Sequence, residues 1–138
     1  MIIDYNSNGL TGFHAEEFPE APDFAVELTS SEFGFNLTYR VQSLAITMEW
    51  SWLKATDTEI RSWTVSDVPR GTLQEPYYDS DQGWNVMIWE MGDHVYVAEG
   101  EGDWDEDRDS NTYTMWFKVP RGLHDRAWVA ALNRLRVG

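Results

Sequence analysis

A β-hairpin pattern lies near the centre of the chain in residues 84–99, which read WNVMIWEMGDHVYVAE. Residues 84–90 and 94–99 are rich in valine, isoleucine, tyrosine and tryptophan, the residue types that favour strands. Residues 91–93, Met-Gly-Asp, separate them, and a three-residue connection that contains glycine is a common hairpin link. The pattern therefore predicts two antiparallel strands joined by a short turn.

Further strands are expected on both sides of this hairpin. A third strand at 112–119 would complete an antiparallel meander, with the polar stretch 100–111 as its loop. Upstream, apolar residues occupy every second position through 33–41 and again through 44–52, which predicts two half-buried strands. A shorter strand is expected at 60–65.

The connection between the two upstream strands allows two interpretations. Gln42 and Ser43 form a weak turn signal. A hairpin and a single bent or bulged strand therefore both remain open.

The last segment changes to a helical period. Its apolar residues follow one another at spacings of four, one, three, one and three: Leu123, Ala127, Trp128, Ala131, Leu132 and Leu135. This spacing is one face of an amphipathic helix, predicted over 123–136. We expect the helix to lay its Trp128 face across the sheet, since a sheet must bury one face.

These elements define a fold class of α+β, mostly β. We expect an antiparallel, meander-like sheet of about five to seven strands, with one C-terminal amphipathic helix packed on it. A length of 138 residues predicts a single domain over 1–138. Glycine, proline and asparagine predict an irregular N-terminal loop region at about 6–23, and a second loop is expected at 71–83.

Composition excludes several classes of protein. The 24 acidic and 10 basic residues leave a formal charge of −14, and a protein that grips phosphates needs the opposite sign, so no nucleic-acid partner is expected. The absence of cysteine excludes disulfide scaffolds, thiol nucleophiles and zinc ribbons. The start shows no leader pattern and the longest apolar run is six residues, so we expect a cytoplasmic protein without a membrane span.

An acidic cluster surrounding Trp104 and a single arginine is the strongest local feature. Its members are Glu99, Glu101, Asp103, Asp105, Glu106, Asp107 and Asp109. A solvated hairpin loop, a weak calcium site and a docking surface for a basic partner are the three interpretations. The calcium pattern that begins at Asp103 fails, because Arg108 stands where a glycine is needed and Thr114 where a bidentate glutamate is needed. Trp104 favours docking, since an aromatic anchor among charges is typical of binding surfaces.

A second acidic patch lies in the loop expected at 71–83, where tyrosines adjoin carboxylates that could bind lysine or arginine. An ordinary turn is the alternative. The predicted partner-binding residues of both patches are Glu101, Asp103, Trp104, Asp105, Glu106, Asp107, Asp109, Tyr77, Tyr78, Asp79 and Asp81.

No catalytic residue is predicted. The three histidines, His14, His94 and His124, are far apart in sequence, and neither a nucleophile elbow nor a glycine-rich phosphate loop is present. Pairs of carboxylates carry little information in so acidic a chain. We therefore expect no cofactor, no metal and no enzymatic activity.

In size, charge and β-rich pattern the chain resembles small acidic bacterial immunity and inhibitor proteins, which cover the active site of a basic toxin. The resemblance implies a non-catalytic protein that docks a basic protein partner, such as a toxin or nuclease, with its charge steering association. Two alternatives remain open. One is a carbohydrate-binding β-sandwich module or an acidic glycan-active enzyme, and the other is a structural subunit of a larger assembly.

The incomplete calcium pattern generates a first prediction. Thermal melts of the chain in chelator and in millimolar calcium should coincide, because the loop lacks the two residues that close a calcium site. Circular dichroism at increasing temperature measures this. A stabilisation by several degrees on adding calcium would show that the acidic cluster is a metal site.

Overall fold

The computed structural model describes residues 1–31, 34–50, 53, 55–81, 84–101 and 111–137. Contacts between Cα atoms divide the chain into two compact units. Unit 1 consists of Met1–Glu20 and Pro69–Arg121, and unit 2 of Ala21–Val68 and Gly122–Gly138. The expectation of a single domain stays a prediction.

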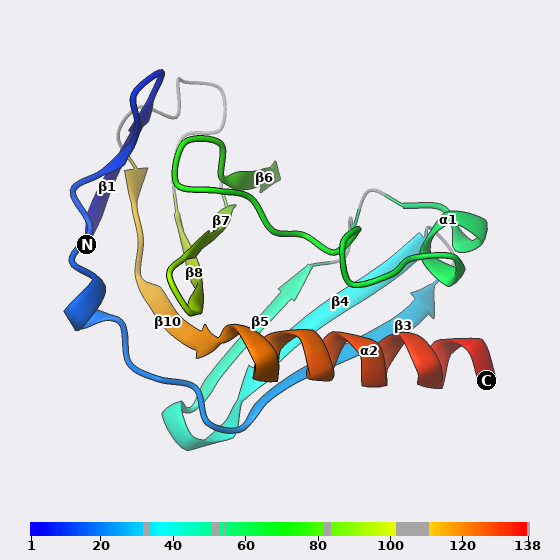
Figure 1. Ribbon diagram of the computed structural model, residues 1–138. Helices are drawn as coiled ribbons and strands as arrows, with labels where there is room; N and C mark the ends of the chain where they lie inside the picture. The colour runs from blue at the N-terminus through cyan, green and yellow to red at the C-terminus, as the bar shows by residue number, and fades with distance from the viewer. Residues whose placement is uncertain (32–33, 51–52, 54, 82–83, 102–110, 138) are drawn as a thin grey trace. The chain divides into compact units, whose positions relative to one another are not determined.

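A four-stranded antiparallel sheet forms the centre of unit 1 (Figure 1). Its strands stand in the order β10-β8-β7-β6, and their bounds are Met115–Pro120 for β10, His94–Glu101 for β8, Trp84–Met91 for β7 and Tyr77–Asp81 for β6. The predicted hairpin is confirmed, since Met91 pairs with His94 across a turn in which Gly92 adopts a φ of 62°. The meander of β7, β8 and β10 is confirmed as well.

Strand β6 corrects the prediction of a loop over 71–83. The segment Tyr77–Asp81 is polar, yet it pairs with β7 along its whole length. Backbone hydrogen bonding to a strong neighbouring strand outweighs its weak intrinsic preference for extended structure, as is common at sheet edges.

The N-terminal segment of unit 1 is more regular than predicted. Strands β1 (Ile2–Asn6), β2 (Gly9–Thr11) and β9 (Asn111–Thr112) form a small antiparallel sheet in the order β2-β1-β9. A short 3-10 helix, Ala15–Glu17, follows. The region 6–23 that was expected to be irregular therefore contains a short strand and a helical turn.

Aromatic side chains build the core of unit 1. The rings of Trp89 on β7 and Tyr96 on β8 stack at a centroid distance of 5.5 Å and an interplanar angle of 9°. Phe13 and Phe18 meet both rings edge-on. These contacts cover one face of the sheet with apolar surface.

Unit 2 contains a three-stranded antiparallel sheet in the order β3-β4-β5. Its strands are β3 (Phe24–Ser31), β4 (Gly34–Val41) and β5 (Ile46–Trp50). The two strands predicted at 33–41 and 44–52 are confirmed over their described residues. A 3-10 turn at Gln42–Leu44, followed by Ala45 at a φ of 53°, joins them as a hairpin.

Two elements of unit 2 depart from the predictions. Strand β3 was not predicted, although its larger apolar residues Phe24, Val26 and Leu28 occupy every second position. The strand predicted at 60–65 is wrong, because the helix α1 (Asp57–Arg61) occupies its start. A capping box between Thr56 and Glu59 satisfies the first amides of α1 and makes this short helix favourable.

The C-terminal helix is confirmed as α2, Arg121–Val137. Its side chain Trp128 is fully buried and donates a hydrogen bond from Nε1 to the Tyr39 hydroxyl of β4 at 2.9 Å. The fold class is confirmed as α+β, mostly β, with the described strands spread over three antiparallel sheets rather than one. Neither described α-helix has both the length and the apolar character needed to cross a bilayer.

The burial of Trp128 generates a prediction about stability. Trp128→Ala should lower the free energy of unfolding by about 3–5 kcal/mol, because it leaves a large cavity and removes the hydrogen bond to Tyr39. Val129→Ala is the matched control, since Val129 is 44% exposed and should change the free energy by less than about 0.5 kcal/mol. Urea denaturation measures both values, and equal effects would contradict the packing of α2.

Candidate functional site

The structure brings the ends of the two predicted acidic patches together. In the register of the sheet, Trp84 of β7 pairs with Asp81 of β6 on one side and with Glu101 of β8 on the other. Asp81 and Glu101 are twenty residues apart in sequence, and the chain reversals on either side of β7 make them neighbours of the same strand. The remaining residues of the first patch, Asp103, Trp104, Asp105, Glu106, Asp107 and Asp109, lie outside the described residues.

The second patch forms part of strand β6 rather than an open turn. Asp79 is 2% exposed and accepts hydrogen bonds at Oδ2 from the Tyr77 hydroxyl, at 3.2 Å, and at Oδ1 from the backbone N–H of Ser80, at 2.9 Å. The Tyr78 hydroxyl donates to Asn85 Oδ1 at 2.8 Å. These three residues therefore make hydrogen bonds within the sheet, and their role in binding a partner stays a prediction.

Tyr77 is held in its neutral form by its surroundings. Burial raises the pKa of its phenol well above the ordinary value, and the charge of Asp79 and the hydrogen bond to Asp79 raise the pKa further. The group that faces Asp79 is thus a hydrogen-bond donor at any physiological pH. This donor offsets part of the cost of burying Asp79.

Glu99 shares a row of the sheet with Asp79. The register aligns Asp79 with Val86 and Val86 with Glu99, on the face opposite the aromatic core. Burial raises the pKa of the half-buried Glu99 carboxyl from 4.5 to about 7. Glu99 belongs to the acidic cluster but was not among the predicted partner-binding residues. Its alternation with Val95 and Val97 is the sequence signal that places it on a buried face of the strand.

Negative charge is concentrated in unit 1. Sixteen of the 24 acidic residues and four of the 10 basic residues fall in its two segments, a formal charge of −12, whereas eight acidic and six basic residues leave unit 2 at −2. If the charged residues were distributed evenly along the chain, the two units would carry similar formal charges. The surface of unit 1 therefore carries most of the electrostatic potential of the protein.

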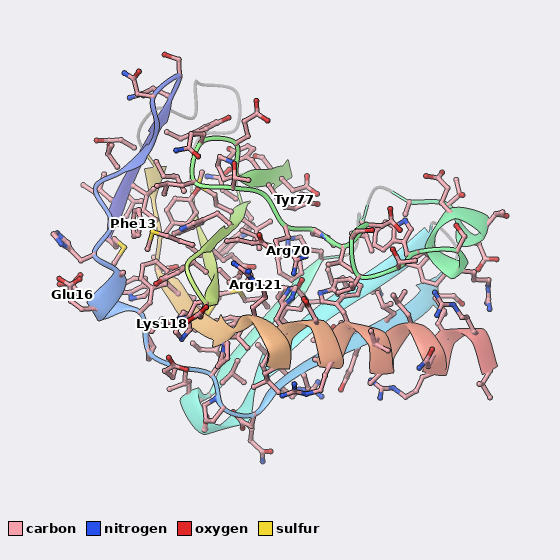
Figure 2. All side chains as sticks on the ribbon, in the orientation of Figure 1. Phe13, Glu16, Arg70, Tyr77, Lys118 and Arg121 are labelled. Atoms are coloured by element: carbon pink, nitrogen blue, oxygen red, sulfur yellow. The ribbon has the colours of Figure 1, made fainter. Side chains whose placement is uncertain are left out.

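The described cations of unit 1 are engaged within the unit itself (Figure 2). Arg70 Nε lies 2.6 Å from Glu90 Oε1, and Arg121 Nε lies 3.8 Å from the same oxygen. Lys118 Nζ donates to the Ala15 carbonyl at 3.4 Å. Because these cations support the β7–β8 hairpin and the N-terminal turn, they form no separate basic patch.

Two further observations concern metal binding by the described residues and the similarity of the chain to known proteins. In the part of the chain that the structure describes, no group of three or more histidine, aspartate or glutamate side chains is placed to hold a metal ion. Comparison of the chain with protein-family models, with curated proteins and with solved structures finds no match.

The raised pKa of Glu99 generates a prediction with a definite sign. A carboxyl whose pKa is higher in the folded state favours folding at low pH, and this advantage is lost as the pH rises from 4.5 to about 7. Glu99→Gln should therefore raise the free energy of unfolding at pH 8, by about 1–2 kcal/mol after allowing for partial solvent screening. At pH 4 it should change little.

Urea denaturation at the two pH values measures this difference. Glu49→Gln, at an exposed position on β5, is the matched control and should leave the pH dependence of the parent chain intact. An equal effect of Glu99→Gln at pH 4 and pH 8 would contradict the raised pKa.

Proposed function

We propose that this chain is a small, acidic, non-catalytic protein that docks a basic protein partner through unit 1. The observation that carries the proposal is the formal charge of −12 in unit 1 against −2 in unit 2. Folding alone does not call for such an imbalance, since like charges in one compact unit repel each other. Binding a cationic surface would relieve that repulsion.

The sheet register indicates where the partner would bind. Trp84 is 45% exposed and lies between the backbone positions of Asp81 and Glu101, so an exposed aromatic side chain adjoins both acidic patches. Aromatic anchors surrounded by polar groups are typical of binding hot spots. We centre the proposed interface on Trp84 and include the acidic segment 101–109 with Trp104, because this segment begins at Glu101, the register partner of Trp84.

The resemblance to immunity and inhibitor proteins indicates the class of partner and the action that we propose. A basic toxin or nuclease in the cytoplasm is the proposed partner, and covering the partner's active site is the proposed action. Long-range attraction would speed association, most strongly at low salt, because charges farther apart than about 10 Å are screened at 0.1 M ionic strength.

Neutralisation of the acidic loop tests the proposal. A tagged chain would first capture partners from lysate at low salt, and the partner eluted by high salt would then be purified for surface plasmon resonance. Changing Asp103, Asp105 and Asp107 to Asn should slow association and flatten its salt dependence. The melting temperature should stay unchanged or rise, since self-repulsion falls. Trp104→Ala should mainly speed dissociation, equivalent to about 2 kcal/mol.

A matched control carries the same change in charge in unit 2. Replacing Glu27, Glu32 and Glu49 with Gln also adds three units of charge, and it should leave the association rate close to that of the parent. Equal slowing by the two triple variants would reduce the effect to net charge and contradict an interface in unit 1. An unchanged rate and salt slope in the loop variant would contradict the assignment of the acidic loop.

Carbohydrate binding is the second candidate, and the exposed Trp84 is the observation that favours it. An exposed indole on a strand, between the backbone positions of two acidic residues, is suited to stacking on a sugar ring. A soluble glycan that quenches tryptophan fluorescence, with the quenching lost in Trp84→Ala, would favour this candidate over a protein partner.

A further inference from the structure

A cavity of about 550 Å³ lies within unit 2, where strand β3 meets the helices α1 and α2. The residues that line it are Glu27, Leu28, Thr29 and Ser30 of β3, Arg61 of α1, and Ala131, Arg134 and Leu135 of α2. This volume is in the range of known ligand sites. The cavity is distinct from the proposed interface, because each of its lining residues belongs to the less charged unit.

The backbone of β3 is open to pairing along this cavity. Strand β3 is an edge strand that pairs with β4 and with no other described strand. The Val26 carbonyl accepts a hydrogen bond from Arg134 Nη2 at 3.0 Å, so the backbone groups of Val26 point away from β4. Because successive residues of a strand alternate, the backbone groups of Leu28 and Ser30 point to the same free edge.

The sequence of β3 lacks the usual protection of an edge strand. Phe24–Ser31 contains neither proline nor lysine, and its single charge, Glu27, forms an ion pair with Arg40 of the neighbouring strand β4. Arg134 covers the edge at Val26. Leu28, Thr29 and Ser30 instead line the cavity, with Thr29 and Ser30 exposed.

Two guanidinium groups border the cavity beside this open edge. Arg61 is fixed in place, since Nε contacts both carboxylate oxygens of Asp57 at 3.0 and 3.1 Å and Nη1 donates to the Leu135 carbonyl at 2.9 Å. Arg134 donates one hydrogen bond to the Val26 carbonyl and forms no ion pair with any described carboxylate. Donors that remain on both groups suit a carboxylate, which guanidinium groups bind through paired hydrogen bonds.

We infer that this cavity is a strand-addition site for an extended, acidic segment of a protein partner. The segment would hydrogen-bond to the free backbone groups of Leu28 and Ser30, and an acidic side chain would lie between Arg61 and Arg134. Main-chain pairing supplies the affinity in this mode of recognition, and the two arginines supply the preference for a carboxylate. The sign of the charge is opposite to that of the interface proposed for unit 1, so the two surfaces select different partners.

Peptide titration of the full-length, ¹⁵N-labelled chain tests the inference. The probe is an equimolar mixture of acetyl-Thr-X-Glu-X-Thr-amide pentapeptides, in which X is Val, Ile, Leu or Tyr. We expect saturable shifts in the amide resonances of Leu28 and Ser30 and in the Arg134 Nε resonance. A mixture with Gln in place of Glu should bind at least about three-fold more weakly, since it lacks the charge-assisted hydrogen bonds.

Two variants separate the role of Arg134 from the loss of a positive charge. Arg134→Gln should remove the difference between the Glu and Gln mixtures. Arg126→Gln removes the same charge from an exposed position on α2 that does not line the cavity, and it should keep the difference. A peptide mixture with N-methylated backbone amides tests strand pairing without changing the protein, and it should not bind.

Several results would overturn the inference. One is the absence of shifts at Leu28 and Ser30, and another is equal binding of the Glu and Gln mixtures. Retained binding of the N-methylated mixture would exclude strand addition. Equal shifts from N-acetylglutamate amide at the same concentration would show a site for small anions. None of these results bears on the interface proposed for unit 1, which is tested with a basic partner.

Discussion

The stacking of Trp89 on Tyr96 is the contact on which unit 1 depends. A unit that carries a formal charge of −12 is destabilised by its own repulsion, and the apolar surface of its aromatic core must outweigh that cost. The stack spans the two strands of the β7–β8 hairpin and anchors Phe13 and Phe18 from the N-terminal segment. Strands β6 and β10 pair with the two sides of this hairpin, and their register sets the positions of the acidic residues.

The cationic side chains of the two units bind different parts of the fold. In unit 1 the described cations bind carboxylate or carbonyl groups of the unit itself, and the unit keeps its formal excess of acids. In unit 2 the arginines hold the C-terminal part of α2: Arg61 binds the Leu135 carbonyl, and Arg136 Nε binds the Arg61 carbonyl at 2.9 Å. Cations at the end of a helix are favourable there, because the helix dipole is negative at its C-terminus. Arg61, which binds the C-terminal part of α2, thus also borders the cavity.

The face of the unit 1 sheet opposite the core carries two titratable groups with raised pKa values, Tyr77 and Glu99. Asp79 is buried beside Tyr77, whose neutral hydroxyl donates to it, and Glu99 follows in the same row with a pKa of about 7. The charge on this face therefore changes near neutrality.

The sequence alone determined the elements whose signals are local. The hairpin of β7 and β8, the hairpin of β4 and β5 and the helix α2 follow from period-2 or helical spacing with a turn between them, because neighbouring residues dictate such patterns. The tertiary structure decided β6, whose weak propensity is outweighed by pairing with a stronger strand. Strand β3 and helix α1 had local signals that the prediction missed, namely the alternation of Phe24, Val26 and Leu28 and the capping box of Thr56 and Glu59. The tertiary structure also decided that Asp81 and Glu101 flank Trp84, that Glu99 is half-buried and that residues of β3, α1 and α2 line one cavity. Each of these features depends on residues distant in sequence, and no local pattern encodes which distant segments pair or how deeply a side chain is then buried.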